Sequence, residues 1–556
     1  MKILTAAEMR EVDRLTTKNF RVPSLTLMEH AGKSVAEFIA ARLPDFKRRR
    51  VIVLCGKGNN GGDGFVIARH LQKMGAKPSV YLIGNPREVK GDAATNLRRW
   101  KRVGKLNVDA PSSRSAPSDF RAGEIMVDAL LGTGVRGPLE GRLAEVVRAV
   151  NQRDPSSVVV AVDMPSGLNA DTGEVPGPVI VADYTVTFTA PKPGLLLHEG
   201  PAHTGQLVVR DIGSPQALIE ETGKGTLRWT EAREFARFSA PRLAAGHKGD
   251  YGHALIVAGS VGKSGAAVMA SWAALRAGAG LVTAAVPEPV LPIVAAHTPE
   301  VMTEPLAATL TGAISDRSLQ GNLFGKLLEG KRALGMGPGL TTHQETQTFV
   351  RAVVGARSGV PIILDADGLN AFAGRAKDLR NPKGLLAVTP HPGEMARLLG
   401  CSTKDVQARR VELAIKAAAD WNACVVLKGY QTVIAAPDGR AWINSTGNPG
   451  MASGGTGDVL TGILAGLTAQ HEGHPGRRLV ELRSSESGGL HRSPETGPGG
   501  SVVDSWPEML AFGVYLHGLA GDIAYAETGG APLMASDLIR CLPRAFQQFY
   551  AECGRG

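Results

Sequence analysis

Short, largely apolar runs recur along the chain, and each is followed by a loop rich in glycine and polar residues. In the first part of the chain these runs cover 51–55, 125–128, 158–162 and 184–188. Helical patterns lie before and between them, for example over 5–19 and 24–42. Apolar strands that alternate with helices are typical of a parallel sheet with both faces covered. The pattern therefore predicts an α/β fold, in which ligands bind beyond the carboxyl ends of the strands.

The same alternation begins again near Tyr251 and continues through the second half of the chain. Its candidate strands cover 253–258, 361–364, 385–389 and 424–427. Its candidate helices cover 264–278, 342–355, 456–470, 508–527 and 536–550. The pattern lapses over 216–226, which we predict to be a linker. We therefore expect a Rossmann-like three-layer αβα domain over 1–215 and a second αβα domain over 227–556.

One long segment of the second domain lacks this alternation. Residues 471–504 are rich in Gly, Ser, Pro, Arg and Glu and show no periodicity. A stretch of this composition is expected to form a flexible loop. We therefore predict an insert between the helix over 456–470 and the helix that follows.

The composition favours an ordinary globular protein and argues against several other classes. Of the 556 residues, 43% are hydrophobic and 21% are charged, and no apolar run approaches the roughly 20 residues that span a bilayer. Thr5 and Glu8 have the spacing of a capping box that opens a helix, and the first residues lack the apolar core of a signal peptide. The five cysteines are scattered, with no Cys-x-x-Cys pair, which indicates a reducing compartment and argues against a zinc site. We therefore expect a cytoplasmic protein.

The net charge of +10 suits small phosphorylated ligands. The basic clusters at 46–50 and 97–102 are interpreted as solvated surface, because neither a series of interleaved aromatic residues nor a nucleic-acid-binding module accompanies them. We therefore expect neither a nucleic-acid nor a membrane partner. A homo-oligomer is compatible with the sequence, which contains no readable interface.

A glycine-rich segment runs from Asn448 to Asp458, just before an apolar helical pattern. Its glycines are Gly450, Gly454, Gly455 and Gly457, and Gly462 follows in the helix. Glycine allows close backbone approach, and the N–H groups at a helix start attract anions. The segment therefore predicts a phosphate-binding cradle with Asp458 facing the ligand. The alternative is a glycine-rich helix cap with a capping acid.

Three polar loops follow strands of the first domain, at 59–64, 127–138 and 162–167. The first supplies side-chain oxygens, and the second supplies backbone amides at Gly132-Thr-Gly134 with a nearby Arg136. Because parallel strands end at one edge of a sheet, the loops are expected to bring together Asn60, Asp128, Asp163 and Ser166. Such oxygen ligands suit K⁺, Mg²⁺ or Ca²⁺ better than zinc, and an acid left free of the cation could transfer protons. Each loop alone is also compatible with simple turn chemistry.

These three loops carry a family resemblance, in the sequences NNGGDG, VDALLGTGVRGP and DMPSG. Together they resemble the YjeF N-terminal domain, the NAD(P)H-hydrate epimerase family, over about residues 1–215. The resemblance implies interconversion of the R and S forms of hydrated NADH or NADPH, with K⁺ bound by Asn60, Asp128 and Ser166. It also implies substrate contacts from two loops and from Asp163, the expected acid–base. The loop residues are Asn59, Asn60, Gly61, Gly62, Asp63, Gly132, Thr133, Gly134, Val135, Arg136, Gly137 and Pro138.

The second domain contains further glycine-rich or polar segments at its predicted strand ends. The run Gly262-Lys-Ser264 is not a phosphate-binding P-loop, because Val257 stands where that motif requires glycine. His391 lies between two prolines in a rigid loop, beside Glu394. A histidine in such a loop at a strand end favours a functional role, although lone histidines are more often structural.

These segments read HKGDYG, GMGPG, DADGLN, TPHPGE, KGYQT and GGTGDVLTG. They resemble the ribokinase-like superfamily and, within it, the ADP-dependent NAD(P)H-hydrate dehydratases, over about 227–556. The resemblance implies an ADP or ATP site, with Mg²⁺, formed by Lys428, Gly429, Tyr430, Gln431, Thr432 and Gly457. It implies contacts with the hydrated nucleotide from Ala266, Gly337, His391 and Asp458. Asp458 is the expected catalytic carboxyl group of this ribokinase-like domain.

The two resemblances imply a bifunctional enzyme, an isomerase fused to a lyase, that repairs hydrated NADH and NADPH. The first domain would epimerise the hydrate, and the second would dehydrate its S form with ADP or ATP. The alternative is a kinase for a small alcohol, of the hydroxymethylpyrimidine or thiazole type, with a non-catalytic N-terminal nucleotide-binding module. Fold alone does not separate these alternatives.

Overall fold

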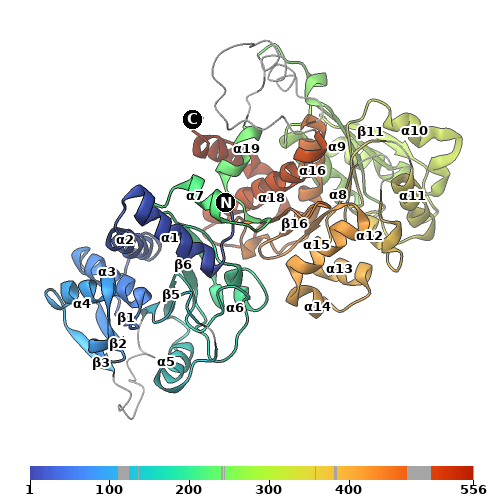
Figure 1. The fold of residues 1–556 in the computed structure, drawn as a ribbon. Helices are drawn as coiled ribbons and strands as arrows, with labels where there is room; N and C mark the ends of the chain where they lie inside the picture. The colour runs from blue at the N-terminus through green and yellow to red at the C-terminus, as the bar shows by residue number, and fades with distance from the viewer. Residues whose placement is uncertain are drawn as a thin grey trace. The chain divides into compact units, whose positions relative to one another are not determined.

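The computed structural model describes residues 1–109, 124–135, 137–239, 242, 244–356, 359–380, 385–471 and 502–554. Arg136 and most of the predicted insert, 472–501, lie outside the described residues. Residue contacts divide the chain into two compact units, Met1–Thr226 and Leu227–Gly556 (Figure 1). Both units are α/β folds built on a largely parallel sheet, which confirms the predicted fold class.

The first unit is built on a seven-stranded, wholly parallel sheet with the strand order β3-β2-β1-β4-β5-β6-β7. Its strands are β1 (Val51–Cys55), β2 (Ser79–Ile83), β3 (Leu106–Asp109), β4 (Ile125–Ala129), β5 (Val158–Val162), β6 (Tyr184–Phe188) and β7 (Gln206–Arg210). Its helices are α1 (Ala6–Phe20), α2 (Ser24–Arg42), α3 (Asn59–Lys73), α4 (Gly91–Lys101), α5 (Gly141–Asn151), α6 (Gly200–Thr204) and α7 (Gln216–Thr222).

Alternate residues of β1 pack into different apolar clusters, one on each face of the sheet. Val51 and Val53 belong to a cluster with residues of α2, α3 and α4, whereas Ile52 and Leu54 pack with residues of α5. Burial on both faces explains why the strands are apolar throughout, as the sequence predicted. The predicted capping box also forms at α1, where the Thr5 hydroxyl accepts from the Glu8 N–H and the Glu8 carboxylate accepts from the Thr5 N–H.

The segment 216–226, which the sequence predicted as a linker, contains the helix α7 and packs on α1. Leu218 and Ile219 of α7 are buried, and the Lys224 N–H donates to the Glu8 carboxylate at 2.9 Å. The segment is therefore an ordered part of the first unit. The local sequence pattern concealed this because α7 is short and its packing depends on residues more than 200 positions away.

The second unit is built on a ten-stranded sheet with the order β11-β10-β9-β12-β13-β14-β15-β16-β17-β8. Among the strands that the structure describes in this sheet, β15–β16 and β16–β17 are the antiparallel pairs. The strands are β8 (Leu227–Trp229), β9 (His253–Val257), β10 (Leu281–Pro287), β11 (Met302–Leu306), β12 (Ala333–Met336), β13 (Ile362–Leu364), β14 (Leu386–Val388), β15 (Cys424–Leu427), β16 (Val433–Ala435) and β17 (Ala441–Ile443).

Helices pack on both faces of this sheet. They are α8 (Ser264–Arg276), α9 (Leu291–His297), α10 (Leu323–Leu328), α11 (Gln344–Gly355), α12 (Asp367–Asn370), α13 (Pro392–Leu399), α14 (Thr403–Ala408), α15 (Arg410–Trp421), α16 (Thr456–His471), α18 (Val502–Glu527) and α19 (Ala535–Glu552). Along β9, Ala254 and Ile256 face the cluster of α8, α16 and α18, whereas Leu255 and Val257 face that of α11 and α15. Within the described residues, no helix combines the length and the apolar character that crossing a membrane requires.

Candidate active sites

A cavity of about 1080 Å³ opens at the carboxyl ends of the strands in the first unit. It is lined by residues of α1 and α2 and by the loops that follow β1, β4, β5 and β6. Its volume is that of a site for a large organic ligand. The cavity brings together most of the predicted substrate contacts of this unit, namely Asn59, Asn60, Asp63, Gly132, Thr133, Gly134, Val135, Gly137, Pro138 and Asp163.

The glycines of the two predicted binding loops have different structural roles. A Cβ at Gly61 would lie 1.9 Å from the Gly56 carbonyl oxygen, and one at Gly62 would lie 2.7 Å from the Met28 sulfur. These two buried glycines therefore let α3 pack closely against its neighbours, and neither lines the cavity. By contrast, no protein atom of the described residues lies within 4 Å of a Cβ built at Gly134. The loop around Gly134 is thus open to close approach by a ligand.

Asp163 follows β5 in a left-handed conformation, with φ of 65°. Residues other than glycine, asparagine and aspartate rarely adopt this conformation. Sparsely populated backbone conformations of this kind are concentrated at functional sites. The Asp163 carboxylate accepts from the Lys192 ammonium at 2.5 Å and from the Thr187 hydroxyl at 3.0 Å. The Lys192 side chain is only 1% exposed and also donates to the Thr187 hydroxyl. Asp163 is therefore a fixed carboxylate whose charge is balanced by a buried cation.

The three predicted cation ligands are joined by hydrogen bonds around Leu131. The Ser166 hydroxyl donates to Asp128 at 2.6 Å and accepts from the Leu131 N–H, and the Asn60 amide donates to the Leu131 carbonyl at 2.8 Å. Burial raises the pKa of Asp128 to about 6, against the opposing hydrogen bonds from Ser166. The Asn60 amide oxygen is buried and has no hydrogen-bond partner among the described residues. A buried oxygen without a donor, beside a buried carboxyl, fits a bound cation.

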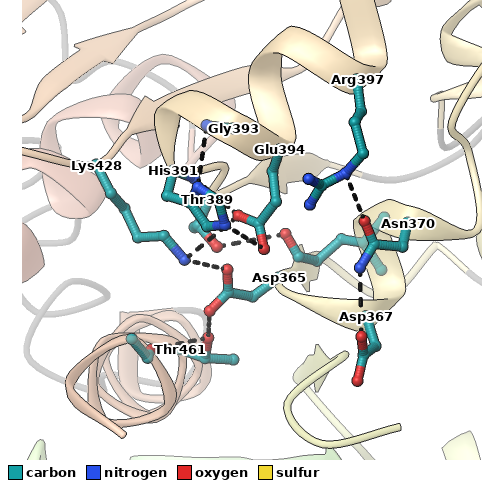
Figure 2. A network of polar contacts seen from close by, with 12 residues as sticks. Asp365, Asp367, Asn370, Thr389, His391, Gly393, Glu394, Arg397, Lys428 and Thr461 are labelled. Carbon is teal, nitrogen blue, oxygen red and sulfur yellow. Dashed lines mark hydrogen bonds and ion pairs between the residues drawn. The ribbon is translucent and has the colours of Figure 1, made fainter. Parts of the chain in front are cut away.

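In the second unit, a polar cluster surrounds the Asp365 carboxylate, which follows β13. Figure 2 shows the Lys428 ammonium and the Thr461 hydroxyl reaching this carboxylate from different elements, at 2.5 and 2.8 Å. Glu394 of α13 completes the cluster, with a carboxylate oxygen 3.9 Å from the Lys428 ammonium. Burial of Glu394 raises the pKa of its carboxyl group. The negative charge of Asp365 also raises this pKa, whereas the positive charge of Lys428 lowers it.

Asp458 lies in the first turn of α16, beside this cluster. The pKa of its carboxyl group is raised to about 7. Burial is the largest cause and the charge of Asp365 adds to it, whereas Lys428 opposes the shift. The adjacent Gly457 is so close to the cluster that a Cβ there would lie 3.4 Å from the Lys428 ammonium. Asp458 can therefore exchange a proton near neutral pH, as general acid–base catalysis requires.

His391 is both a structural cap and an exposed imidazole. Its Nδ1 accepts from the Gly393 N–H at 3.0 Å, and its own backbone N–H donates to Glu394 at 2.8 Å (Figure 2). Burial lowers the pKa of the imidazole, and the positive charges of Lys428 and Arg397 lower it further. The neutral ring therefore carries its proton on Nε2, which lies 3.4 Å from a Glu394 carboxylate oxygen, and the side chain is half exposed.

Other predicted residues of this unit shape the backbone around Asp365 and Lys428. A Cβ at Gly337, where φ is 131°, would lie 1.8 Å from the Asp365 carbonyl oxygen, so only glycine fits there. Ala266 of α8 is nearly buried. The predicted nucleotide-binding residues 428–432 connect the antiparallel strands β15 and β16, and Tyr430 among them is exposed. The turn contains Gly429, Gln431 and Thr432, whose hydroxyl donates to the Gly429 carbonyl.

Several site residues were not among the predicted contacts. Lys192 could have been found from its sequence setting, because it lies between two prolines after a strand, as His391 does. Thr461 lies one helical turn after Gly457, which places it on the same face as the glycine. Asp13 of α1 also lines the N-terminal cavity, and no local motif indicates it. Asp365 lies in a segment that the sequence singled out, but without an assigned role.

Within the described residues, no group of three or more His, Cys, Asp or Glu side chains is placed to hold a metal ion. The oxygens around Leu131 come mainly from an amide, a hydroxyl and a single carboxylate, so they differ from such a group.

Comparison with known proteins assigns both units. Residues 24–194 match the family described as YjeF-related protein N-terminus, and residues 254–543 match the NAD(P)H-hydrate dehydratase family. The bifunctional NAD(P)H-hydrate repair enzyme Nnr of Moorella thermoacetica is 43% identical, over 99% of this chain and 98% of the relative. The enzyme of the same name from Thermofilum pendens is 38% identical over 98% of this chain and 96% of the relative.

A solved structure of the ADP/ATP-dependent NAD(P)H-hydrate dehydratase from Bacillus subtilis is also similar. It shares 32% identity with a TM-score of 0.44, and the match covers 58% of this chain and 98% of that one. Together, the two family matches and the full-length relatives account for both units of the molecule. The chain belongs to the family of bifunctional NAD(P)H-hydrate repair enzymes.

Proposed function

We propose that the first unit interconverts the R and S forms of hydrated NADH and NADPH, and that the second unit dehydrates the S form to NAD(P)H with ADP or ATP. The observation that carries this proposal is the presence of two separate acidic centres in one chain, Asp163 in the N-terminal cavity and Asp458 beside Lys428. The full-length similarity to bifunctional repair enzymes supports the division of labour. The five cysteines are free, which supports a cytoplasmic location.

In the N-terminal cavity, the loops at 59–63 and 132–138 bind the substrate and Asp163 transfers protons at the hydrated nicotinamide. Epimerisation changes the configuration of the carbon that carries the hydroxyl group, so a proton must be given to and taken from that group. The ion pair with Lys192 fixes the position of the Asp163 side chain at the cavity wall, where it can exchange a proton with the substrate.

Asn60, Asp128 and Ser166 hold K⁺ in this proposal, and the ion supplies a fixed positive charge at the base of the loop that follows β4. The partnerless amide oxygen of Asn60 supports the assignment. The hydrogen bonds that Asn60 and Ser166 make to Leu131 connect the ion-binding residues to the substrate loop. Loss of the ion would therefore disorder the loop and weaken substrate binding.

The Asn60→Ala variant is expected to need about 10–100-fold more K⁺ for half-maximal epimerisation, because it removes the amide oxygen that has no other donor. Epimerisation is measured over a KCl series, with ionic strength held constant by tetramethylammonium chloride. Equal K⁺ dependence in the variant and the wild type would contradict the assignment of Asn60 as a ligand.

In the second unit, residues 428–432 and Gly457 bind ADP or ATP with Mg²⁺, and Ala266, Gly337, His391 and Asp458 contact the hydrate. Asp458 takes the proton of the hydroxyl group as that oxygen attacks the terminal phosphorus of the nucleotide. The resulting phosphate ester then loses phosphate from one carbon and a proton from its neighbour, which restores the ring double bond. The sum is hydrate plus ATP giving NAD(P)H, ADP, phosphate and a proton, and ADP reacts in the same way to give AMP.

The Lys428→Gln variant is expected to raise the KM for ADP or ATP by about 10–100-fold, because a charge-assisted contact to phosphate is lost. The substitution also leaves the carboxylates of Asp365 and Glu394 without the Lys428 cation. The kcat of dehydration should therefore fall as well. Lys416→Gln, which removes an exposed lysine paired with Asp420, is the matched control. Unchanged nucleotide KM in Lys428→Gln would exclude Lys428 from the nucleotide site.

Purified substrates separate the two proposed activities from the kinase alternative. The R hydrate without nucleotide should be converted to the S form, as followed by chromatography. The S hydrate with ADP or ATP and Mg²⁺ should yield the absorbance of the reduced nicotinamide. Phosphorylation of a hydroxymethylpyrimidine or thiazole alcohol, without action on either hydrate, would replace the proposal with a small-alcohol kinase.

A further inference from the structure

The helix α1 carries a carboxyl group into the N-terminal cavity that the proposed chemistry leaves unused. Asp13 lines the cavity together with Met9 and Arg10 of the same helix. The helix is held rigidly, because a capping box begins it and Val12 and Thr16 are buried against the unit. Asp13 is therefore presented to the cavity from a fixed element.

One oxygen of the Asp13 carboxyl group has no partner. The Oδ1 atom is buried and makes no hydrogen bond to any residue that the structure describes. Burial is the largest influence on this group and raises its pKa to about 6, while Lys192 lowers the pKa and Asp163 raises it. A desolvated, unpartnered carboxyl group favours its protonated form. Asp163 has a different environment, because its carboxyl group is ion-paired with Lys192 and accepts a hydrogen bond from the Thr187 hydroxyl.

We infer that Asp13 is a second catalytic residue of the epimerase site, which gives a proton to the hydroxyl group of the hydrate as that group leaves. The inference deepens the proposed epimerase function and depends on it. Two carboxyl groups in contrasting environments within one cavity are the arrangement from which acid and base roles are assigned. Asp13 is then the acid and Asp163 the base in one direction, and the roles exchange in the other.

The chemistry of inversion requires a proton donor and a proton acceptor. The electron pair of the ring nitrogen expels the hydroxyl group, which takes the Asp13 proton and leaves as water, so the ring becomes a cation. A water molecule then adds to the opposite face of the ring and gives a proton to Asp163. The net change in the protein is one proton moved from Asp13 to Asp163, and the reverse reaction or exchange with solvent returns it.

The surrounding charges favour a single proton shared by the two acids. Lys192 is ion-paired with Asp163 and acts electrostatically on Asp13. Asp63 of α3 is buried nearby, and burial, Asp163 and Asp13 all raise its pKa well above the usual value. Arg10 and Arg14 line the same cavity. Epimerisation should therefore be fastest where the pair of Asp13 and Asp163 carries one proton, and should decline as pH rises past about 6.

The Asp13→Asn variant of the full chain is expected to lower the kcat of epimerisation by about 10²-fold, with the KM for the R hydrate little changed. The decline of the wild-type rate at rising pH should be absent from the variant, after subtraction of the uncatalysed rate at each pH. Asp13→Glu, which keeps a carboxyl group, should recover part of the activity and restore a pH-dependent decline. Glu37→Gln, which removes an exposed carboxylate of α2 paired with Lys33 outside the cavity, is the matched control.

The outcomes separate this inference from the proposed function. Absence of epimerisation by the wild-type chain would reject the epimerase function itself. An active wild type with unchanged kcat and pH profile in Asp13→Asn would overturn the role of Asp13 alone. A rise in KM without a change of pH profile would also overturn it, since that result indicates substrate binding only. If Asp13→Asn fails to fold, Asp13→Glu decides, because a lowered kcat with a pH-dependent decline is expected and an unchanged kcat would contradict the inference.

Discussion

The Asp163→Asn variant is expected to lose about 10²–10⁴-fold in the kcat of epimerisation, while dehydration of the S hydrate by the same chain is unchanged. Asparagine is the appropriate replacement because it keeps the side-chain size and tolerates the left-handed conformation at this position, where φ is 65°. The measurement is conversion of purified R hydrate in the absence of nucleotide. Epimerisation at the wild-type rate would remove Asp163 from the mechanism.

The same substitution should also destabilise the first unit. It leaves the Lys192 ammonium, which is 1% exposed, without a charged partner, at a cost of about 3 kcal/mol. The double variant Asp163→Asn with Lys192→Met removes the unpaired charge and should recover most of this stability, measured by denaturant unfolding. The double variant should remain inactive as an epimerase, which separates loss of the catalytic carboxylate from loss of stability.

The Asp458→Asn variant is expected to lower the kcat of dehydration by about 10²–10⁴-fold and to leave epimerisation intact. In the wild type, dehydration should increase as pH rises through about 7, because the carboxyl group must be ionised to take the proton of the hydroxyl group. The remaining activity of the variant should lack this dependence. Full conversion of the S hydrate by the variant at the wild-type rate would exclude Asp458 as the base.

A stability measurement provides an independent check on Asp458. Its pKa in the folded protein is raised from 3.8 to about 7, so the unfolded chain releases this proton more readily. The stability of the wild type should therefore fall as pH rises between these values, and the loss is complete above about 7. Asp458→Asn removes this loss and should be more stable than the wild type by about 1–2 kcal/mol at alkaline pH. No gain in stability would indicate that the carboxylate is well solvated.

The sequence predicted the architecture well because burial on both faces imposes a simple pattern. The apolar runs at Val51–Cys55 and Cys424–Leu427 are central strands, and uniform burial leaves no room for polar residues in them. Loops at the carboxyl ends of such strands meet at one edge, which explains why Asn60 and Asp163 could be placed in one site from the sequence.

Features that depend on distant pairing were not predictable in this way. The strand β8 adds to the edge of the second sheet by pairing with β17, more than 200 residues later, and three residues are too few for a periodic signal. Gly61 has a packing role that the sequence did not indicate, because its backbone lies against Gly56 and lets α3 pack closely. Its contact with the substrate stays a prediction. Asp13 came to light only through tertiary structure, because its significance lies in what surrounds it.

The fusion of the two units has a chemical rationale. Hydration of the nicotinamide ring gives both epimers, and a dehydratase specific for the S form would leave the R form unrepaired. An epimerase in the same chain supplies the S form continuously, and the fusion keeps the two enzyme domains in equal amounts. In the proposed mechanism the two steps depend on separate acidic residues, Asp163 and Asp458, so each step should be disabled without the other.

The most direct test is recovery of the reduced-nicotinamide absorbance from a purified mixture of R and S NADH hydrate, with and without ADP or ATP. The account predicts complete recovery that requires the nucleotide, and recovery limited to the S fraction in Asp163→Asn. Recovery by the wild type that stops at the S fraction would contradict the epimerase assignment. No recovery with either nucleotide would contradict the account as a whole.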